Sequence, residues 1–409
     1  MLRKVRPKIA LIWERYLVNR DDRAAALAER LEGRAEVLAI EVATTTDLYA
    51  DFPPSGPVGK AIKQTLFPGR SFDDVKPWRR FLAMFRAVSG CRIVCIGVPY
   101  SKPDVLLLVW VLRLLGKKVA LASVSKFDDY PRTSGFEFAK RLALAGFHTV
   151  IVPGVRSLEY YRFLGFRRSR LLFGGNSISI ERVRSQAASA LDKTPIPFGE
   201  RDFVYVGRFI EKKNLSLLIE AFARYCALEP SSRRKLVLIG SGPLEAQLRE
   251  AAASKVPVGR IEFAGFLSGV ALYGRLSQGL GLVLVSISEQ WGEVVNEALA
   301  LGLPLILSEA PGARDVLVRN LVNGFVLENG STEGVARAMQ QLGADEAAWQ
   351  RMCEASRIRA PLGDVAVFVD AIESLFDPAA ASQQSGIKAY NAAVEEFQGP
   401  PTHGKLDRD

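Results

Sequence analysis

Cysteine and histidine are scarce in this chain, which limits the sites that its side chains can build. Its 409 residues include four cysteines and two histidines. Cys91 and Cys95 are the only close pair, and on one strand they would lie ~13 Å apart, too far for a disulfide bond. No CxxC motif is present, and His148 and His403 cannot form a zinc site with these cysteines. The sequence therefore predicts neither a disulfide framework nor a structural metal.

Long apolar runs and a secretory signal are missing as well. The longest apolar run, Val105–Leu115, contains Arg113 and falls short of the ~20 residues that span a bilayer. Residues 1–8 are basic, but the apolar stretch after them stops at Trp13 without a small-residue cleavage site. We therefore expect a cytoplasmic protein.

Charge is distributed unevenly along the chain. Residues 1–190 contain 32 Lys and Arg against 17 Asp and Glu, a net charge of +15, whereas residues 191–409 contain 22 against 27, a net charge of −5. A basic half favours an anionic partner such as a nucleic acid, lipid headgroups or a phosphate-bearing substrate; a solvated basic surface is the alternative. No helix-turn-helix, zinc-finger or RNP-like motif accompanies the charge, so we do not expect nucleic-acid binding.

Both halves of the chain alternate short apolar runs with helical patterns. Such alternation predicts a parallel sheet covered by helices on both faces. In the first half it predicts strands at 9–13, 37–42, 93–98, 118–122 and 149–152, and helices at 23–31, 105–115 and 136–145. In the second half it predicts strands at 203–206, 236–239, 261–263, 282–285 and 305–307, and helices at 215–224, 244–252, 272–277 and 293–301.

This pattern predicts an α/β fold with two Rossmann-like domains that face each other across a cleft. The first domain covers residues 1–190 and the second covers 201–363, with a Pro- and Gly-containing linker at 191–200. Domains of this kind bind ligands at the carboxyl ends of their strands. A helix at 364–377 is expected to return to the first domain, and residues 378–409 are expected to be a disordered tail.

Two polar motifs follow strand ends in the second domain. Gly207 and Arg208 come directly after strand 203–206, and Lys213 lies five residues beyond Arg208. Two cations at one strand end suit a dianion such as a diphosphate, although exposed Arg and Lys side chains are common on any surface. The other motif is a turn after strand 236–239 whose backbone can approach a ligand closely at a helix N-terminus; it contains Gly240, Ser241 and Gly242.

A pair of glutamates eight residues apart forms the third motif. Glu289 lies in the loop after strand 282–285, Gly292 allows the chain to enter a helix, and Glu297 lies on that helix. Two carboxylates placed in this way can hold two sets of hydroxyl groups in one ligand. The apolar neighbours of Glu297 indicate partial burial, which is costly for a carboxylate without a partner.

The order of these motifs resembles the retaining GT-B glycosyltransferases of family 4. It reads GR…K, GSGP, FxG, E-x7-E and GLPLILS…GA…NG over residues 200–376, while residues 1–190 share only the domain pattern. The resemblance implies a hexosyltransferase-type enzyme that moves a sugar from a nucleotide sugar to a glycan or lipid-linked acceptor in cell-surface polysaccharide or glycolipid synthesis. It also implies retention of configuration without a protein nucleophile, a metal or a cofactor.

The resemblance also assigns roles to individual residues. Arg208 and Lys213 would bind the donor diphosphate and stabilise the charge that develops on it. Glu289 would hold donor-sugar hydroxyls and would act as a catalytic residue together with Arg208 and Lys213. Glu297 would hold the ribose. Further donor contacts are expected from Gly207, Gly240, Ser241, Gly242, Phe266, Leu267, Gly292, Glu293 and Val294.

The acceptor half departs from the family pattern. Residues 13–16, with the sequence WERY, replace the glycine-rich loop of many members, and no histidine stands at the place of their sugar-facing histidine. Asp128 and Asp129 after strand 118–122 are candidates to orient an acceptor hydroxyl, with a solvated acidic turn as the alternative. The sequence does not identify the acceptor-side catalytic group.

Residues 76–88 predict an amphipathic helix with Trp78 and Phe81 on one side and basic residues between its apolar positions. The stripe is typical of a core-facing helix. Together with the basic half, it also fits contact with anionic lipid through Arg79 and Arg80, which would place the protein at the inner face of the membrane.

Two other functions remain open from the sequence alone. A GT-B relative that transfers nothing, such as a sugar-nucleotide epimerase, would act on the donor by itself. A glycosyltransferase-like subunit would bind nucleotide or glycan without turnover. The GR…K and E-x7-E motifs favour transfer over both.

Overall fold

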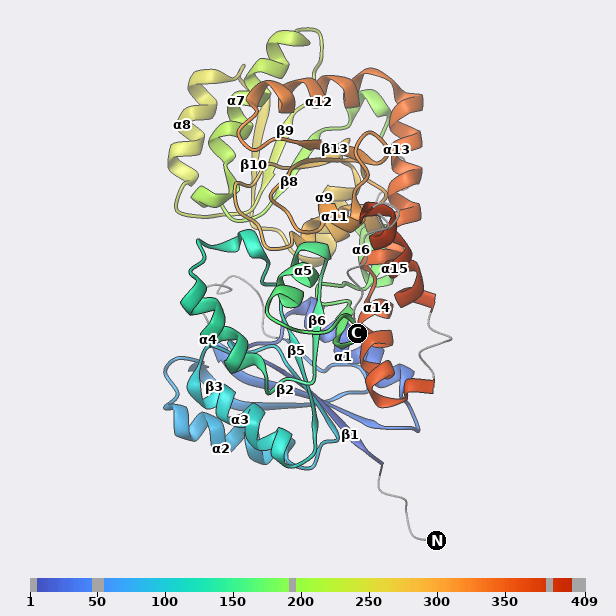
Figure 1. Ribbon diagram of the computed structural model, residues 1–409. Helices are drawn as coiled ribbons and strands as arrows, with labels where there is room; N and C mark the ends of the chain where they lie inside the picture. Colours follow the sequence, from blue (N-terminus) through green and yellow to red (C-terminus); the bar gives the residue numbers. More distant parts are fainter. Residues whose placement is uncertain (1–5, 46–54, 191–195, 380–384, 399–409) are drawn as a thin grey trace. The chain divides into compact units, whose positions relative to one another are not determined.

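The computed structural model describes residues 6–45, 55–190, 196–379 and 385–398 (Figure 1). The chain forms two compact units, one from Met1–Ser179 with Val365–Lys388 and the other from Ile180–Asp364 with Ala389–Asp409. Each unit is built on a fully parallel sheet. The predicted α/β class is therefore confirmed.

The first unit contains a seven-stranded sheet in the order β3-β2-β1-β4-β5-β6-β7. Its strands are β1 (Lys8–Trp13), β2 (Glu36–Thr45), β3 (Ile62–Ser71), β4 (Ile93–Ile96), β5 (Lys118–Ala122), β6 (Thr149–Val152) and β7 (Leu171–Phe173). Its helices are α1 (Val18–Arg30), α2 (Pro77–Val88), α3 (Pro103–Leu114), α4 (Ser134–Leu144), α5 (Val155–Phe163) and α14 (Val365–Phe376). Successive residues of the central strands are all buried, so both faces of this sheet are covered.

Helix α14 completes the core of the first unit although it lies near the end of the chain. Phe368 and Ile372 join strand residues such as Leu11 in one apolar cluster, on the side that α1 also covers. At the edge of this contact, Arg34 Nη1 lies 2.5 Å from the carboxylate of Glu373. Burial of the apolar face of α14 explains why this segment is helical.

The second unit contains a six-stranded sheet in the order β10-β9-β8-β11-β12-β13. Its strands are β8 (Phe203–Val206), β9 (Leu236–Ile239), β10 (Ile261–Gly265), β11 (Gly281–Leu284), β12 (Leu305–Ser308) and β13 (Gly324–Leu327). Its helices are α6 (Ile180–Ala190), α7 (Leu215–Leu228), α8 (Glu245–Lys255), α9 (Gly269–Ser277), α10 (Glu293–Ala300), α11 (Arg314–Leu317), α12 (Thr332–Ala344) and α13 (Glu346–Arg359).

Both sheets reverse their strand order at one point, between β1 and β4 in the first unit and between β8 and β11 in the second. At such a point the two loops that leave the strands run in opposite directions and open a crevice at the carboxyl ends. The motifs at 207–213 and 289–297 follow β8 and β11, so they lie at the reversal of the second sheet.

Three boundaries differ from the sequence predictions. Helix α6, placed within the first domain by sequence, belongs to the second unit because it packs against α9. The tail predicted to be disordered contains helix α15 (Ser385–Gln398), whose side chains Tyr390 and Val394 are buried. Residues 399–409 lie outside the described residues. Part of the predicted linker, Phe198–Glu200, forms a short 3-10 helix, and 191–195 are not described.

All four cysteines are buried and free. Among the described residues, no helix has both the length and the apolar character needed to cross a membrane.

Candidate functional site

The loops after β8 and β11 are joined to each other at the reversal of the second sheet. The ammonium group of Lys213 forms an ion pair with the carboxylate of Glu289, and each side chain is only 13% exposed. Nearby, the backbone N–H of Ile287 donates to the carbonyl oxygen of Lys212 at 2.9 Å. The structure thus brings together two residues that the sequence selected 76 positions apart.

A close backbone contact at a glycine joins the loop after β8 to the turn after β9. Gly240 has a φ of +140°, and a Cβ atom there would overlap the carbonyl oxygen of Gly207. Phe209 N–H also donates to the Ser241 carbonyl oxygen at 2.8 Å. The two loops therefore pack backbone against backbone. Only glycine at position 240 leaves room for this contact.

Tyr205 fixes the backbone that carries Arg208. Its hydroxyl donates to the carbonyl oxygen of Arg208 at 3.0 Å, while the Arg208 side chain is exposed. Burial, and then the negative charge of Glu289, raise the pKa of Tyr205. The hydroxyl therefore stays protonated and remains a hydrogen-bond donor at neutral pH.

Helix α10 begins at the same site. Gly292 precedes it with a φ of +93°, a conformation that favours glycine. The buried indole of Trp291 donates from Nε1 to Asn296 Oδ1 at 2.9 Å and so holds the loop to the helix. The first N–H groups of α10, around Glu293 and Val294, are a favourable environment for an anion.

Glu297 has a partner that the sequence did not indicate. The hydroxyl of Tyr273 in α9 donates to Glu297 Oε1 at 3.1 Å, and Arg182 Nη1 in α6 donates to the Tyr273 oxygen at 3.2 Å. Burial, followed by the charge of Glu297, raises the pKa of Tyr273. No spacing rule connects positions 182, 273 and 297, because only the packing of three helices brings them together.

Phe266 and Leu267 follow β10, the strand beside β9. The N–H of Gly240 donates to the Gly265 carbonyl oxygen at 2.8 Å, so the residues after Gly265 begin next to the glycine-rich turn. Phe266 is 36% exposed. An exposed ring at this sheet edge offers a surface on which a planar group could stack.

The acceptor-side candidates of the first unit have local partners. The side chain of Asp129 is buried, and its carboxylate accepts the backbone N–H of Lys126 at 2.9 Å. Asp128 is half exposed and lies 2.7 Å from Lys126 Nζ and 2.8 Å from Arg156 Nη1. Burial alone would raise the pKa of Asp128, but these two cations outweigh it and lower the value. Asp129 thus holds the turn at 126–129, and Asp128 joins this turn to Arg156 of α5.

The end of β1 holds a carboxylate that the sequence did not select. Glu14 is half-buried at the reversal between β1 and β4, and burial raises the pKa of its side chain. Before it, Trp13 is buried against Gly97, where a Cβ atom would overlap the indole ring. The indole of Trp13 therefore packs directly against the backbone that follows β4.

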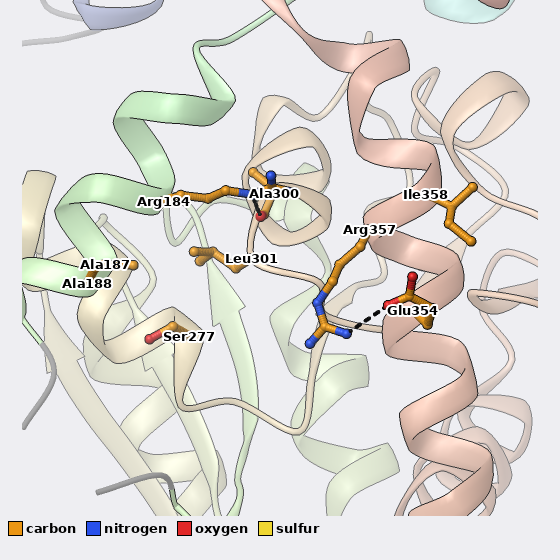
Figure 2. A pocket seen from close by; sticks show the side chains of 9 residues that line it. All are labelled: Arg184, Ala187, Ala188, Ser277, Ala300, Leu301, Glu354, Arg357 and Ile358. Atoms are coloured by element: carbon orange, nitrogen blue, oxygen red, sulfur yellow. Dashed lines mark hydrogen bonds and ion pairs between the residues drawn. The ribbon is translucent and has the colours of Figure 1, made fainter. Parts of the chain in front are cut away.

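A separate hollow of about 650 Å³ lies on the second unit, among α6, α10 and α13. Figure 2 shows its two arginines already engaged: Arg184 Nε donates to the Ala300 carbonyl oxygen at 2.7 Å, and Arg357 Nη1 lies 3.3 Å from Glu354. None of the motif residues at 207–213, 240–242 or 289–297 lines this hollow. The hollow is therefore distinct from the site at the reversal between β8 and β11.

Comparisons with known proteins identify a family and individual relatives of this chain. Residues 188–359 match the family described as glycosyl transferases group 1. The chain is 28% identical over 270 residues to the lipopolysaccharide core biosynthesis glycosyltransferase LpsE of Rhizobium meliloti (strain 1021), an alignment that covers 62% of this chain and 69% of that protein. It is 29% identical over 163 residues to the O-antigen chain mannosyltransferase C of Escherichia coli, covering 39% and 42% of the two chains.

The fold comparison extends over nearly the whole chain. The crystal structure of Anabaena HepE in complex with UDP and glucose is similar with a TM-score of 0.67. The match covers 91% of this chain and 100% of that chain at 15% sequence identity. At this identity the likeness shows a shared fold.

Proposed function

Because the chain is a GT-B glycosyltransferase of the group 1 type, we propose that it transfers a hexose from a nucleotide sugar to a glycan or lipid-linked acceptor in cell-surface polysaccharide or glycolipid synthesis. The observation that carries this proposal is the Lys213–Glu289 pair beside Arg208 at the sheet reversal. The similarity to LpsE and to an O-antigen mannosyltransferase supports the acceptor class. The UDP and glucose bound by HepE support the donor class.

In the proposed reaction, Arg208 and Lys213 receive the donor diphosphate together with the N-terminus of α10. The bond between the anomeric carbon and the diphosphate oxygen breaks, and the carbon forms a bond to the acceptor oxygen on the same face, so the configuration is retained. The acceptor proton passes to the leaving phosphate. Preorganised positive charge stabilises the diphosphate as it leaves, and each such group contributes about 10²–10³ in rate.

The two carboxylates would hold the rest of the donor. Glu289, released from Lys213 when the diphosphate arrives, would accept hydrogen bonds from sugar hydroxyls. Glu297, held by Tyr273, would accept those of the ribose. The backbone at Gly207, Gly240 and Gly242 would approach the nucleotide closely. We propose no metal and no cofactor, because two cations at one strand end can neutralise the diphosphate.

On the acceptor side we propose Glu14 as the residue that orients the acceptor hydroxyl. It lies at the reversal of the first sheet, and its carboxyl is half-buried there, whereas Asp128 and Asp129 are held by the turn at 126–129. Replacing Glu14 by Gln should lower kcat without changing nucleotide binding. Unchanged kcat would remove Glu14 from the mechanism.

The proposal is tested by incubating the protein with UDP-, GDP- and ADP-hexoses, with and without a bacterial lipid extract as acceptor. We expect nucleoside diphosphate and a glycosylated lipid only when both substrates are present, with a chelator causing no loss. Conversion of the sugar nucleotide without acceptor would instead identify an epimerase. Nucleotide binding without any product would favour the non-catalytic subunit, and dependence on added metal would contradict the metal-free mechanism.

A further inference from the structure

Exposed aromatic side chains are concentrated on one part of the first unit. Among the described residues, eight Phe, Trp and Tyr side chains are exposed, and seven of them lie on α2, α3, α4, α5 or the loop before α4. These seven are Trp78, Trp110, Phe127, Tyr130, Phe136, Phe138 and Phe163. Soluble proteins rarely expose large apolar side chains in a cluster unless the surface binds something.

Exposed leucines extend the same surface. They lie on α2, α3 and α4 or directly after α3, and include Leu114, which is 83% exposed; the others are Leu82, Leu107, Leu115 and Leu142. We call the seven aromatic residues and these five leucines the apolar face.

The helices that carry the apolar face are neighbours in space. Helix α2 packs against α3. Gly146, two residues after α4, lies beside the ring of Trp110 on α3, because a Cβ atom there would be 3.2 Å from that ring. Gly165, two residues after α5, lies beside Arg141 on α4, with a corresponding distance of 2.9 Å. The apolar face is therefore spread over one continuous layer of helices.

The charge exposed on α2, α3 and α4 has a single sign. Their two acidic residues, Asp104 and Glu137, are both buried and ion-paired, with Asp104 lying 2.6 Å from Arg80 and Glu137 lying 3.2 Å from Arg132. The exposed charged side chains of these helices are all arginines, namely Arg79, Arg86, Arg113 and Arg141. On α5 the exposed Glu159 is paired with Arg162 at 3.3 Å, and Asp128 before α4 is paired with Lys126 and Arg156. The apolar face therefore presents apolar groups together with net positive charge.

We propose that the apolar face docks on the surface of an anionic phospholipid bilayer. Aromatic and leucine side chains would enter the interface while the four arginines contact lipid phosphates, as in helices that lie in the plane of a membrane. A second copy of this chain fits less well, since a two-fold contact would place the arginines against arginines. Single-stranded nucleic acid also fits less well, because leucines such as Leu114 cannot stack on bases.

The structure corrects one part of the sequence interpretation of α2. Arg80 is only 2% exposed, its guanidinium lies 4.0 Å from the ring centre of Phe72, and it binds Asp104 of α3 through two nitrogens. It therefore joins α2 to α3 and does not contact lipid, because reversing its charge would leave Asp104 buried without a partner. Arg79 and Trp78, which is 62% exposed, remain on the surface.

Co-sedimentation of the full chain with vesicles tests the proposal. We expect binding to vesicles of equal parts phosphatidylglycerol and phosphatidylcholine, and little binding to phosphatidylcholine alone. The double variant Leu114→Asp, Phe138→Asp should bind at least about tenfold more weakly. Val258→Asp is the matched control, because Val258 is fully exposed on the second unit, outside the apolar face, and its replacement should change nothing. Arg113→Glu with Arg141→Glu should weaken binding most at low salt.

The outcomes separate this proposal from its rivals and from the proposed function. Wild-type protein that ignores anionic vesicles, or a double variant that binds them like wild type, would overturn it. Light scattering could instead show a dimer that the double variant does not form, with no binding of the protein to vesicles. That result would assign the apolar face to a contact with a second copy and would also overturn the proposal. Stabilisation by nucleotide, measured on the same variants, should be unaffected, so a failure at the membrane would not count against the donor site.

Discussion

The ammonium group of Lys213 and the carboxylate of Glu289 form an ion pair that closes the loop after β8 onto the loop after β11. Both side chains are largely buried, so each satisfies the charge of the other. A donor with a diphosphate beside a sugar offers a partner to each of them: phosphate oxygens to Lys213 and hydroxyl groups to Glu289. The ion pair is thus the resting form of the proposed donor site.

Removing Lys213 should therefore abolish most of the activity. Lys213→Ala is expected to lower kcat/KM for the donor by about a hundredfold, because the leaving diphosphate loses one preorganised cation. Lys212→Ala is the matched control, since Lys212 precedes it in the same short helix and is not assigned to the donor. Steady-state kinetics with both variants provides the measurement, and equal activities would contradict the assignment.

Tyr273 should affect donor affinity through Glu297. Tyr273→Phe removes the 3.1 Å hydrogen bond that holds this carboxylate, so KM for the donor should rise about tenfold, the equivalent of one such bond, while kcat changes little. Tyr225→Phe removes a hydroxyl that lies 2.8 Å from Ser232 in the same unit and serves as the control. If both variants raise KM equally, Tyr273 has only a structural role.

Gly240 should tolerate no side chain. Gly240→Ala forces a Cβ atom onto the carbonyl oxygen of Gly207 at a positive φ, which should reduce the free energy of unfolding by about 2 kcal/mol and weaken nucleotide binding. Gly199→Ala meets no atom within 4 Å and should be neutral. Urea unfolding of both variants checks this, and similar midpoints would show that the two loops are not packed as described.

Asp21 should make the first unit less stable as the pH rises. Burial raises the pKa of Asp21 to about 6 although Ser55 donates a hydrogen bond to it. Between about pH 4 and 6 the folded state holds a proton that the unfolded state has lost, so unfolding becomes easier as the pH rises through this range.

Asp21→Asn should remove this pH-dependent loss of stability. Because the group is partly exposed, we expect a gain of at most about 1 kcal/mol at pH 7 and no gain near pH 4. Urea unfolding at the two pH values measures it. A variant that is less stable than wild type at pH 7 would show that the charged form is the favoured one.

Strands with continuous apolar runs were predictable from sequence, whereas elements that depend on distant partners were not. Strands β5, β6, β8 and β9 have the predicted bounds, because a strand covered on both faces appears in the sequence as a short run of successive apolar residues. Strand β3 was missed, since it lies at the sheet edge, is partly exposed and contains Pro68 and Gly69.

In the candidate site, too, some residues are predictable from the sequence and others depend on distant partners. Motif order indicated Arg208, Lys213 and the two glutamates, because these residues follow strand ends. It could not indicate Tyr273, whose contact with Glu297 depends on how α9 packs beside α10. The amphipathic pattern of residues 76–88 placed Arg80 on the surface, because the burial of this cation depends on Asp104, a partner on another helix.

The donor site is tested most directly by thermal unfolding with UDP, GDP and ADP in wild type, Arg208→Ala and the control Arg351→Ala, which removes an exposed arginine of α13. A nucleotide at a hundredfold excess over its dissociation constant stabilises the folded state by about 2.7 kcal/mol. We expect a clear upward shift with one of the three nucleotides in wild type and in Arg351→Ala, and its loss in Arg208→Ala. An equal shift in all three proteins, or none with any nucleotide, would contradict a donor site at Arg208.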